Sequence, residues 1–296
     1  MSAFHGGNIW RIGNIVKCKI RHVQKFGGWF GVVDRRDKVA ATSGKGVPMK
    51  VGLVCPCRTE FTAITETLRF ESLQSLDGRL VARRNEEHDL VAVLSGFGKT
   101  RAASATQWLI DMEKADLLLD VGAAGALDPS LGVFAMALGD SAYEYDWMAG
   151  PQPDGHDELR KTFASLNAFS DEQRKVLDEW LEAAKNDMGL AIHVGRIAAG
   201  ERNVDNATLR DGLHHTTGAL ACNWETSAVL LTAAMAARPA MSFRVITDSA
   251  DGAMQVDLRA NWSEAMEKLA ALIGHFVDGE WLTRLGPLPP ARGPAV

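Results

Sequence analysis

Three carboxylates and one arginine stand beside short apolar segments that are typical of buried strands. Glu60 follows the segment VGLVC, and Arg244 and Asp248 lie within and at the end of SFRVITD. Glu225 opens an otherwise apolar helical segment, where a lone carboxylate is costly unless it is paired or faces a ligand. Taken singly, each residue fits a helix cap, a surface charge or a salt bridge. Together they place an acid–base site at one edge of a predicted sheet.

The segments that must position these residues alternate between strand-like and helix-like spacing. This alternation predicts an α/β fold with a largely parallel central sheet, in which ligands bind at the carboxyl ends of the strands. The helix at 224–237 is apolar on nearly every side, so we expect it to be buried. The predicted strands are 51–55, 90–94, 115–122, one that begins near 134, 190–200 and 242–248, and the predicted helices are 58–68, 101–113, 171–186, 224–237 and 262–277.

Two glycine-rich turns resemble nucleotide-binding loops only superficially. Gly98-Lys99-Thr100 matches the end of a phosphate-binding P-loop, but that motif needs a glycine at position 93, which is Val93. Gly122 to Gly125 lacks the spacing of a dinucleotide-binding loop. The turns therefore indicate only that the backbone approaches a ligand or a neighbouring strand closely.

Composition places the chain among soluble globular proteins. It has 296 residues, of which 46% are hydrophobic and 23% charged, and no apolar run approaches the roughly 18 residues that span a bilayer. The N-terminus has no apolar signal region. Cys18, Cys55, Cys57 and Cys222 are too few and too irregular for a disulfide framework or a zinc site, so we expect buried thiols. We predict a cytoplasmic protein that contacts no membrane and needs no metal or cofactor.

Charge is distributed unevenly along the chain. Residues 1–50 hold ten Lys and Arg against two Asp and Glu, whereas the whole chain holds 32 against 37. The basic segment could be an arm for a polyanion, solvating charge outside the fold, or a stretch upstream of a natural start at Met49; we favour the last two. It carries no nucleic-acid-binding motif, although a small hairpin fits it. We expect an extension at 1–48, a domain at 49–280 and a disordered Pro-rich tail at 281–296.

Six segments in order resemble the blocks of a known enzyme family. They are MKVGLVCPCRTEF, VAVLSGFGKTRAA, LLLDVGAAGAL, GRIAAGE, CNWETSA and FRVITDSAD. Through them, residues 49–277 resemble the purine nucleoside phosphorylase/uridine phosphorylase superfamily, and within it the methylthioadenosine/S-adenosylhomocysteine nucleosidases most closely. The resemblance implies a three-layer α/β/α sandwich around a mixed, largely parallel sheet, a homodimer, and a small-molecule nucleoside as substrate.

The resemblance also assigns roles to the matching residues. It implies that Glu60 is the base for the attacking water, that Asp248 protonates or hydrogen-bonds N7 of the purine, and that Arg244 orients the carboxylates and the water. The other matches are substrate contacts: Glu225 at the ribose hydroxyls, Trp224 beside the ribose, Ser95 and Gly96 in the loop that lines it, and Asn203 with Val204 where the family stacks the base.

The chemistry independently needs such a set of groups. Cleavage of an N-ribosidic bond develops positive charge on the sugar and negative charge on the base. A proton donor must therefore neutralise the leaving purine while carboxylates stabilise the sugar. Asp248 would have to be protonated near neutral pH, which a partly buried site with other carboxylates favours.

The sequence departs from the family pattern in two places that bear on the substrate. Asn223 stands where the family has a first glutamate, and Trp224 replaces the methionine beside the ribose. Asn203 stands where the family stacks adenine on a phenylalanine, so that contact is lost unless Trp224, Trp147 or Tyr145 replaces it. Methylthioadenosine is therefore one candidate among adenine or modified purine nucleosides.

The nature of the acceptor depends on one strand end. Related phosphorylases carry a phosphate-binding arginine there, whereas this chain has Asp120, which we expect to repel phosphate. Arg58 in the first loop keeps phosphate as an option. We therefore predict a nucleosidase that uses water, with a phosphate-dependent phosphorylase and a non-catalytic nucleoside-binding protein as the alternatives.

Overall fold

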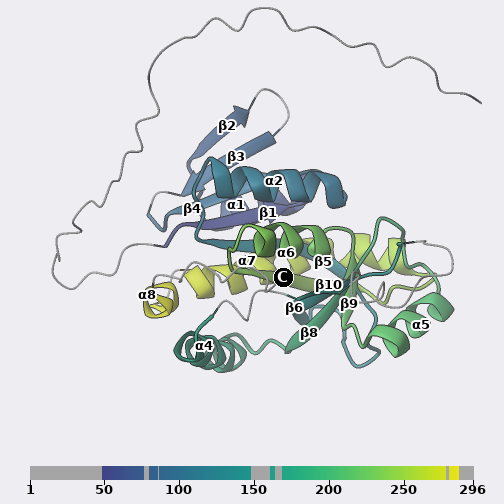
Figure 1. The fold of residues 1–296 in the computed structure, drawn as a ribbon. Helices are drawn as coiled ribbons and strands as arrows, with labels where there is room; N and C mark the ends of the chain where they lie inside the picture. The colour runs from purple at the N-terminus through teal and green to yellow at the C-terminus, as the bar shows by residue number, and fades with distance from the viewer. Residues whose placement is uncertain are drawn as a thin grey trace, which may run out of the picture. The chain divides into compact units, whose positions relative to one another are not determined.

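Ten strands and seven helices make up a mixed α/β fold in the residues that the computed structural model describes (Figure 1). These are residues 49–76, 80–85, 87–147, 161–163, 169–277 and 280–286. The strands are β1 Val51–Cys55, β2 Ser72–Leu76, β3 Leu80–Asn85, β4 Leu90–Leu94, β5 Leu117–Ala126, β6 Met136–Glu144, β7 Lys161–Phe163, β8 Ile192–Ala199, β9 Ala221–Asn223 and β10 Ala240–Asp248. The helices are α1 Arg58–Thr67, α2 Lys99–Asp111, α4 Asp171–Met188, α5 Ala207–Thr217, α6 Thr226–Met235, α7 Met254–Val277 and α8 Trp281–Leu285.

The ten described strands form one sheet that partly closes on itself. Strands β5, β10, β6, β8 and β9 pair in a ring, since β10 pairs with β5 and β5 also pairs with β9. Strands β1, β4, β3 and β2 extend from β5 as an open sheet. Five of the ten pairings are parallel and five are antiparallel. The expected mixed α/β fold is confirmed, but the sheet is not largely parallel and its closure departs from a simple three-layer sandwich.

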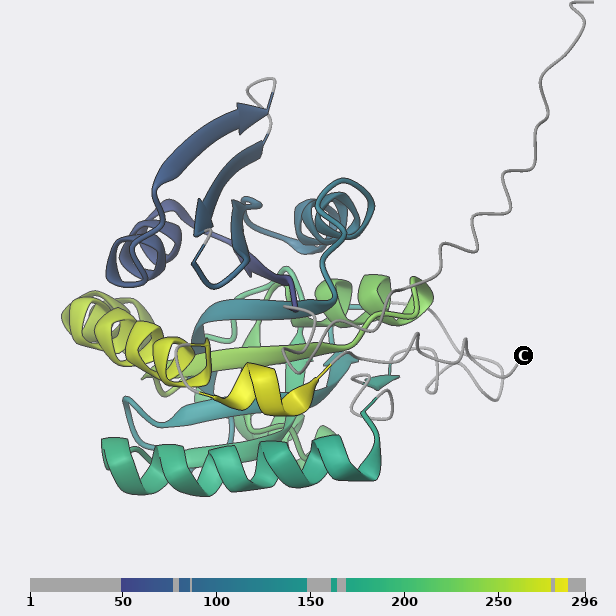
Figure 2. The same ribbon diagram turned by 90° about the vertical axis from the view of Figure 1, so that its left-hand side faces the viewer.

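Helices pack on both faces of the sheet beside β5 (Figures 1 and 2). Helices α2 and α6 pack against each other and against β1, β4 and β5 on one face, where a small-residue core of alanines, valines and leucines lies. Helices α1 and α7 pack on the other face over a larger core. That core includes an aromatic cluster of Trp180, Phe243 and Phe276, with ring centroids 4.8 to 5.8 Å apart. The elements that carry the candidate residues are therefore held from both sides.

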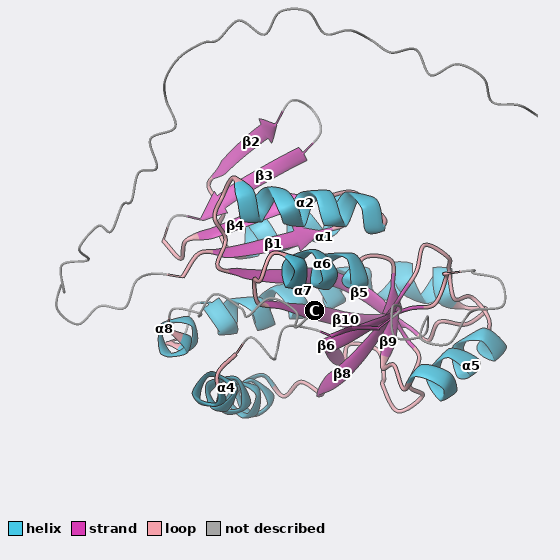
Figure 3. Ribbon diagram, in the orientation of Figure 1, coloured by secondary structure: helices cyan, strands magenta, loops and turns pink. Residues whose placement is uncertain are grey.

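The predicted elements that surround the candidate residues are confirmed, with longer bounds in several cases (Figure 3). Strand β5 runs to Ala126, past the predicted end at residue 122, and α7 begins at Met254, eight residues before the predicted start. The hairpin of β2 and β3, helix α5 and the short strand β9 were not predicted. Residues 281–285 form α8, with Leu282 and Leu285 buried, so the folded part extends into the segment expected to be a tail.

Removal of residues 1–48 is expected to leave the fold and the activity intact. The basic extension, with its possible hairpin, lies outside the described residues, whereas the site is built entirely from residue 56 onward. A chain that starts at Met49 should remain soluble and unfold at the temperature of the full chain. Circular dichroism melting and activity per mole check this. Insoluble protein after truncation would show that the extension packs on the domain or on another subunit.

Candidate active site

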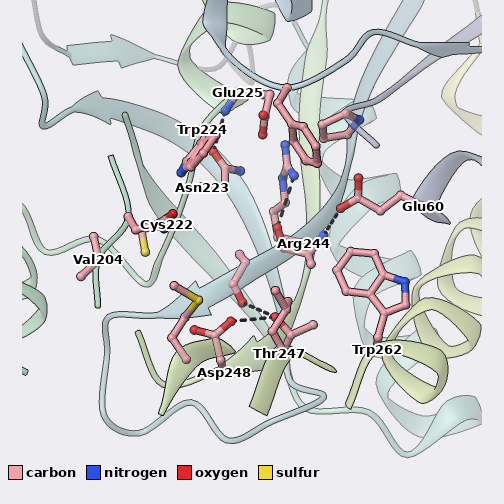
Figure 4. Close-up of a pocket in the computed structure, with 18 of the residues that line it drawn as sticks. Glu60, Val204, Cys222, Asn223, Trp224, Glu225, Arg244, Thr247, Asp248 and Trp262 are labelled. Carbon is pink, nitrogen blue, oxygen red and sulfur yellow. Dashed lines mark hydrogen bonds between the residues drawn. The ribbon is translucent and has the colours of Figure 1, made fainter. Parts of the chain in front are cut away.

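A cavity of about 260 Å³ opens where β5, β9 and β10 meet the starts of α1, α6 and α7 (Figure 4). Its walls are mostly apolar, and the four ionisable residues predicted from the sequence all reach it. The lining residues are Pro56, Glu60, Phe97, Ala123, Ala124, Gly125, Tyr145, Asn203, Val204, Cys222, Asn223, Trp224, Glu225, Arg244, Thr247, Asp248, Met254, Leu258 and Trp262. An apolar cavity with a few convergent polar groups is the usual form of a small-molecule site.

Glu60 is fixed by the start of α1. The backbone N–H of Cys57 donates to Oε2 of Glu60 (2.9 Å), and the backbone N–H of Glu60 reaches the Cys57 sulfur, so the two residues form a capping box. The backbone N–H of Ala123 donates to Oε1 (2.9 Å). Burial raises the pKa of Glu60, which Arg244 and these hydrogen bonds oppose. A carboxylate oxygen can accept two hydrogen bonds, and each oxygen of Glu60 accepts one of those described here, so one acceptor position per oxygen is left for a water molecule.

Arg244 lies on β10 and pairs with Asp120 on the neighbouring strand β5. Both side chains are fully buried, and the guanidinium donates from Nη2 to Oδ1 and from Nε to Oδ2 of Asp120. A Cβ atom at Gly122 would lie 2.6 Å from Oε1 of Glu60 and 2.7 Å from Nη1 of Arg244. Only glycine at this position therefore lets the base and the arginine approach the same point of β5.

Asp120 does not act as the sequence suggested. It does not line the cavity, and its oxygens accept hydrogen bonds from Arg244 and from the hydroxyls of Thr226 and Ser242. Arg244 compensates the charge of Asp120 within the protein. The prediction that Asp120 repels phosphate is therefore wrong, and it does not favour water over phosphate as the acceptor.

Glu225 precedes α6 and points toward Arg244 (Figure 4). The backbone N–H of Gly98 donates to its Oε1 (3.0 Å), which ties the glycine-rich loop to this carboxylate. The pKa of Glu225 is raised to about 7, chiefly by burial; Arg244 and the Gly98 N–H lower it, and Asp120 and Glu60 raise it. Glu225 therefore changes charge in the physiological range.

Asp248 ends β10 beside a register shift in the pairing with β5 that sets it opposite Gly125. A Cβ at Gly125 would lie 2.8 Å from its Oδ1, so this glycine too makes room for a site carboxylate. The backbone N–H of Ala250 donates to Oδ1 (2.9 Å) and the hydroxyl of Thr247 bonds Oδ2 (2.9 Å). Burial raises the pKa of Asp248. The residue thus forms a turn and also lines the cavity.

The predicted substrate contacts divide into two groups. Trp224, Asn203 and Val204 line the cavity, whereas Ser95 and Gly96 do not. The hydroxyl of Ser95 is directed to backbone carbonyls instead, and the same loop reaches the cavity one residue later, through Phe97. The ring of Phe97 makes an edge contact with Trp224 at a centroid distance of 6.0 Å.

Aromatic and apolar residues complete the walls, and the sequence analysis named only some of them. Of the proposed replacements for the lost stacking residue, Tyr145 and Trp224 line the cavity and Trp147 does not. Met254, Leu258 and Trp262 line it from the first turns of α7. Their spacing of four residues was a signal for one helix face, but the helix was predicted to begin only at Trp262.

Comparison with known proteins identifies the family. Residues 50–278 match the model of the phosphorylase superfamily. The chain belongs to this superfamily. It is 28% identical over 198 residues to a 5'-methylthioadenosine/S-adenosylhomocysteine nucleosidase of Staphylococcus saprophyticus, which covers 66% of this chain and 82% of the relative. It is 24% identical over 216 residues to an aminodeoxyfutalosine nucleosidase of Campylobacter jejuni, covering 71% and 90%.

Solved structures of other proteins share the fold of nearly the whole domain. The Helicobacter pylori nucleosidase solved with 5'-methylthioadenosine in its active site has a TM-score of 0.67 at 19% identity, covering 78% of this chain and 99% of that one. The Neisseria meningitidis nucleosidase in complex with methylthio-immucillin-A has a TM-score of 0.65 at 23% identity, covering 77% and 98%. None of the helices described here is long and apolar enough to cross a membrane.

Proposed function

We propose that this superfamily member is a nucleosidase that hydrolyses the N-ribosidic bond of a purine nucleoside. The observation that carries the proposal is the convergence of Glu60, Glu225, Asp248 and Arg244 on one mostly apolar cavity. Enzymes that hydrolyse glycosidic bonds usually use two carboxyl groups on opposite sides of the bond, one as the acid and one as the base. The names of both sequence relatives, which are nucleosidases, support the same activity.

The roles follow from the surroundings of each carboxylate. Asp248, whose burial raises its pKa, is suited to hold a proton and donate it to the leaving base. When Asp248 is protonated at Oδ2, Thr247 can accept that hydrogen bond and donate its own proton to the Ala124 carbonyl, which lies 3.4 Å away. The turn around Asp248 thus accommodates both protonation states.

Glu225 and Glu60, on the side of the cavity opposite Asp248, are the candidates for binding the sugar and the attacking water. Glu225 faces Arg244, which supports a role in binding ribose hydroxyls and in stabilising the positive charge that develops on the sugar. Glu60 keeps a free acceptor position on each oxygen and is placed to bind water and take its proton. Figure 4 shows Asp248 across the cavity from Glu225 and Glu60, so acid and base can act on different ends of one nucleoside.

The walls favour an adenine-type nucleoside with an apolar substituent. Met254, Leu258 and Trp262 present one apolar helix face to the cavity, and Tyr145 and Trp224 supply aromatic surface where Asn203 offers none. Methylthioadenosine and S-adenosylhomocysteine, which name the relatives, are therefore the first substrates to test. We also propose a cytoplasmic homodimer, on the strength of the family resemblance alone.

The charge of the cavity disfavours phosphate as the acceptor. Among the described lining residues, Arg244 is the one cation, and it faces Glu60 and Glu225 in addition to its partner Asp120. A phosphate dianion would enter a site whose positive charge is already neutralised. Retention of all four ionisable groups argues likewise against a non-catalytic binding protein.

Release of the base is therefore expected to proceed without phosphate. Methylthioadenosine and a panel of nucleosides would be incubated with the protein in phosphate-free buffer and again with added phosphate, and free base and sugar separated by chromatography. Equal rates are expected in both buffers, with the free sugar as the product, which is methylthioribose when methylthioadenosine is the substrate. Strict dependence on phosphate, with the sugar 1-phosphate as the product, would identify a phosphorylase instead.

A further inference from the structure

A buried polar cluster lies directly behind the catalytic cavity. We name it the Asp120 cluster; it consists of Asp120, Asn223, Thr226, Ser242 and Arg244. Asp120, Thr226, Ser242 and Arg244 have no exposed surface, and Asn223 is 8% exposed. Buried polar groups are retained at a cost unless they are fully hydrogen-bonded, so such a cluster needs an explanation.

Asp120 is the acceptor on which the cluster converges. Oδ2 accepts from Thr226 Oγ1 (2.6 Å), Ser242 Oγ (2.7 Å) and Arg244 Nε (3.2 Å), and Oδ1 accepts from Arg244 Nη2. Both oxygens are hydrogen-bonded within the protein, and Asp120 is fully buried and does not line the cavity, so it does not contact a substrate. Its role must act through the groups that it binds.

The cluster includes Arg244 and contacts the backbone of Glu225, the two groups proposed to lie near the sugar. Arg244 lines the cavity itself. On the other side, Asn223 donates to Thr226 Oγ1 (2.5 Å) and accepts the backbone N–H groups of Glu225 and Thr226 (both 3.1 Å). The amide of Asn223 is therefore used to fix the backbone of Glu225 at the start of α6.

We propose that Asp120, held by Thr226 and Ser242, is a positioning residue that anchors Arg244 to β5 and keeps its charge from pairing with Glu60 and Glu225. The inference rests on the proposed function, because it assigns a reason for the geometry of that site. Arg244 lies between three carboxylates, and a buried guanidinium prefers bidentate pairing with a carboxylate. Bidentate pairing with Asp120 leaves the two cavity carboxylates for water and ribose.

Neutralising Asp120 should redirect Arg244 toward the cavity. The charged or titratable groups that face Glu225 are Arg244 from β10, Asp120 from β5, Glu60 from α1 and Tyr145 next to β6. Asp120 raises the pKa of Glu225, and Arg244 lowers it. Loss of the Asp120 charge removes one influence that raises the pKa of Glu225, while burial and Glu60 still raise it and Arg244 still lowers it, so Glu225 would stay ionised to lower pH than in the wild type.

The test compares Asp120→Asn with the wild type in a nucleosidase assay across pH. We expect kcat to fall about 10- to 100-fold, as for a misplaced catalytic group, and the acidic limb of kcat/KM to move down by roughly one pH unit. A purely structural residue would change the melting temperature but neither kcat per folded molecule nor that limb. A folded Asp120→Asn with an unchanged limb and an unchanged kcat overturns the proposal.

A second variant decides the matter if Asp120→Asn does not fold. Thr226→Val removes one hydroxyl donor to Asp120 while keeping side-chain shape, and kcat should fall about 10-fold. Thr106→Val is the matched control, because Thr106 is equally buried in a helix and its hydroxyl donates to the Ala102 carbonyl (2.8 Å), away from the cavity. Equal kcat in the two variants overturns the proposal.

The position of Arg244 can be read without any activity. If the wild type releases no base from any nucleoside, the proposed function fails, and the crystal structure of Thr226→Val still tests the cluster. A guanidinium displaced from Asp120 toward Glu60 or Glu225 supports the anchoring role. A guanidinium in its present place overturns it.

Discussion

Replacement of Asp248 by asparagine is expected to lower kcat by about 100- to 10,000-fold while a nucleoside still binds. The fold around the residue should survive. Asparagine keeps an oxygen that can accept from the Ala250 N–H, and its amide can donate to Thr247. What the variant lacks is a proton that it can transfer to the departing purine. The measurements are kcat and the rise in melting temperature on addition of the nucleoside.

The control for this prediction is a turn of the same kind outside the cavity. Asp128 accepts the backbone N–H of Ser130 (2.8 Å), two residues ahead, as Asp248 accepts that of Ala250. Asp128→Asn should leave kcat unchanged. If Asp248→Asn turned over at a rate close to the wild type, Asp248 would be a turn residue only and would leave the mechanism.

The sequence was sufficient to predict that the four ionisable residues come together because each lies within or beside a short, strongly apolar element. Glu60 lies in the first turn of α1 after β1, Glu225 directly precedes α6, and Asp248 ends β10; the pattern alone located β1, α6 and β10. Close backbone approach at Gly122 and Gly125 was also predicted, and both glycines make room for site side chains. Local signals therefore carried the positions of the functional groups.

Contacts between residues that depend on how the strands pair could not be predicted from the sequence. Asp120 and Arg244 are 124 residues apart, and their contact exists because β5 and β10 pair in parallel register. Without that register Asp120 looked like a free charge at the site. The closure of the sheet has the same origin, since it depends on the two-residue antiparallel pairing of β9 with β5, for which a strand of three residues gives no periodic signal.

Replacement of Glu60 by glutamine is expected to reduce kcat by about 100- to 10,000-fold, because an amide cannot take a proton from water. This variant should also be less stable. Glu60 accepts from the backbone N–H groups of Cys57 and Ala123 through its two oxygens, and the amide nitrogen of glutamine would face one of those donors. Loss of that cap should cost about 1 kcal/mol of unfolding free energy.

Stability and catalysis must therefore be separated for this residue. Glu113 provides the matched control, because it is a buried carboxylate, 9% exposed, that pairs with Arg84 at 2.5 Å and does not line the cavity. Glu113→Gln should lower the melting temperature while kcat stays at the wild-type value. If Glu60→Gln lost only as much activity as Glu113→Gln, Glu60 would be a helix cap that happens to line the cavity. A selective loss of kcat, with folded protein and retained nucleoside binding, would instead identify Glu60 as the group that activates water.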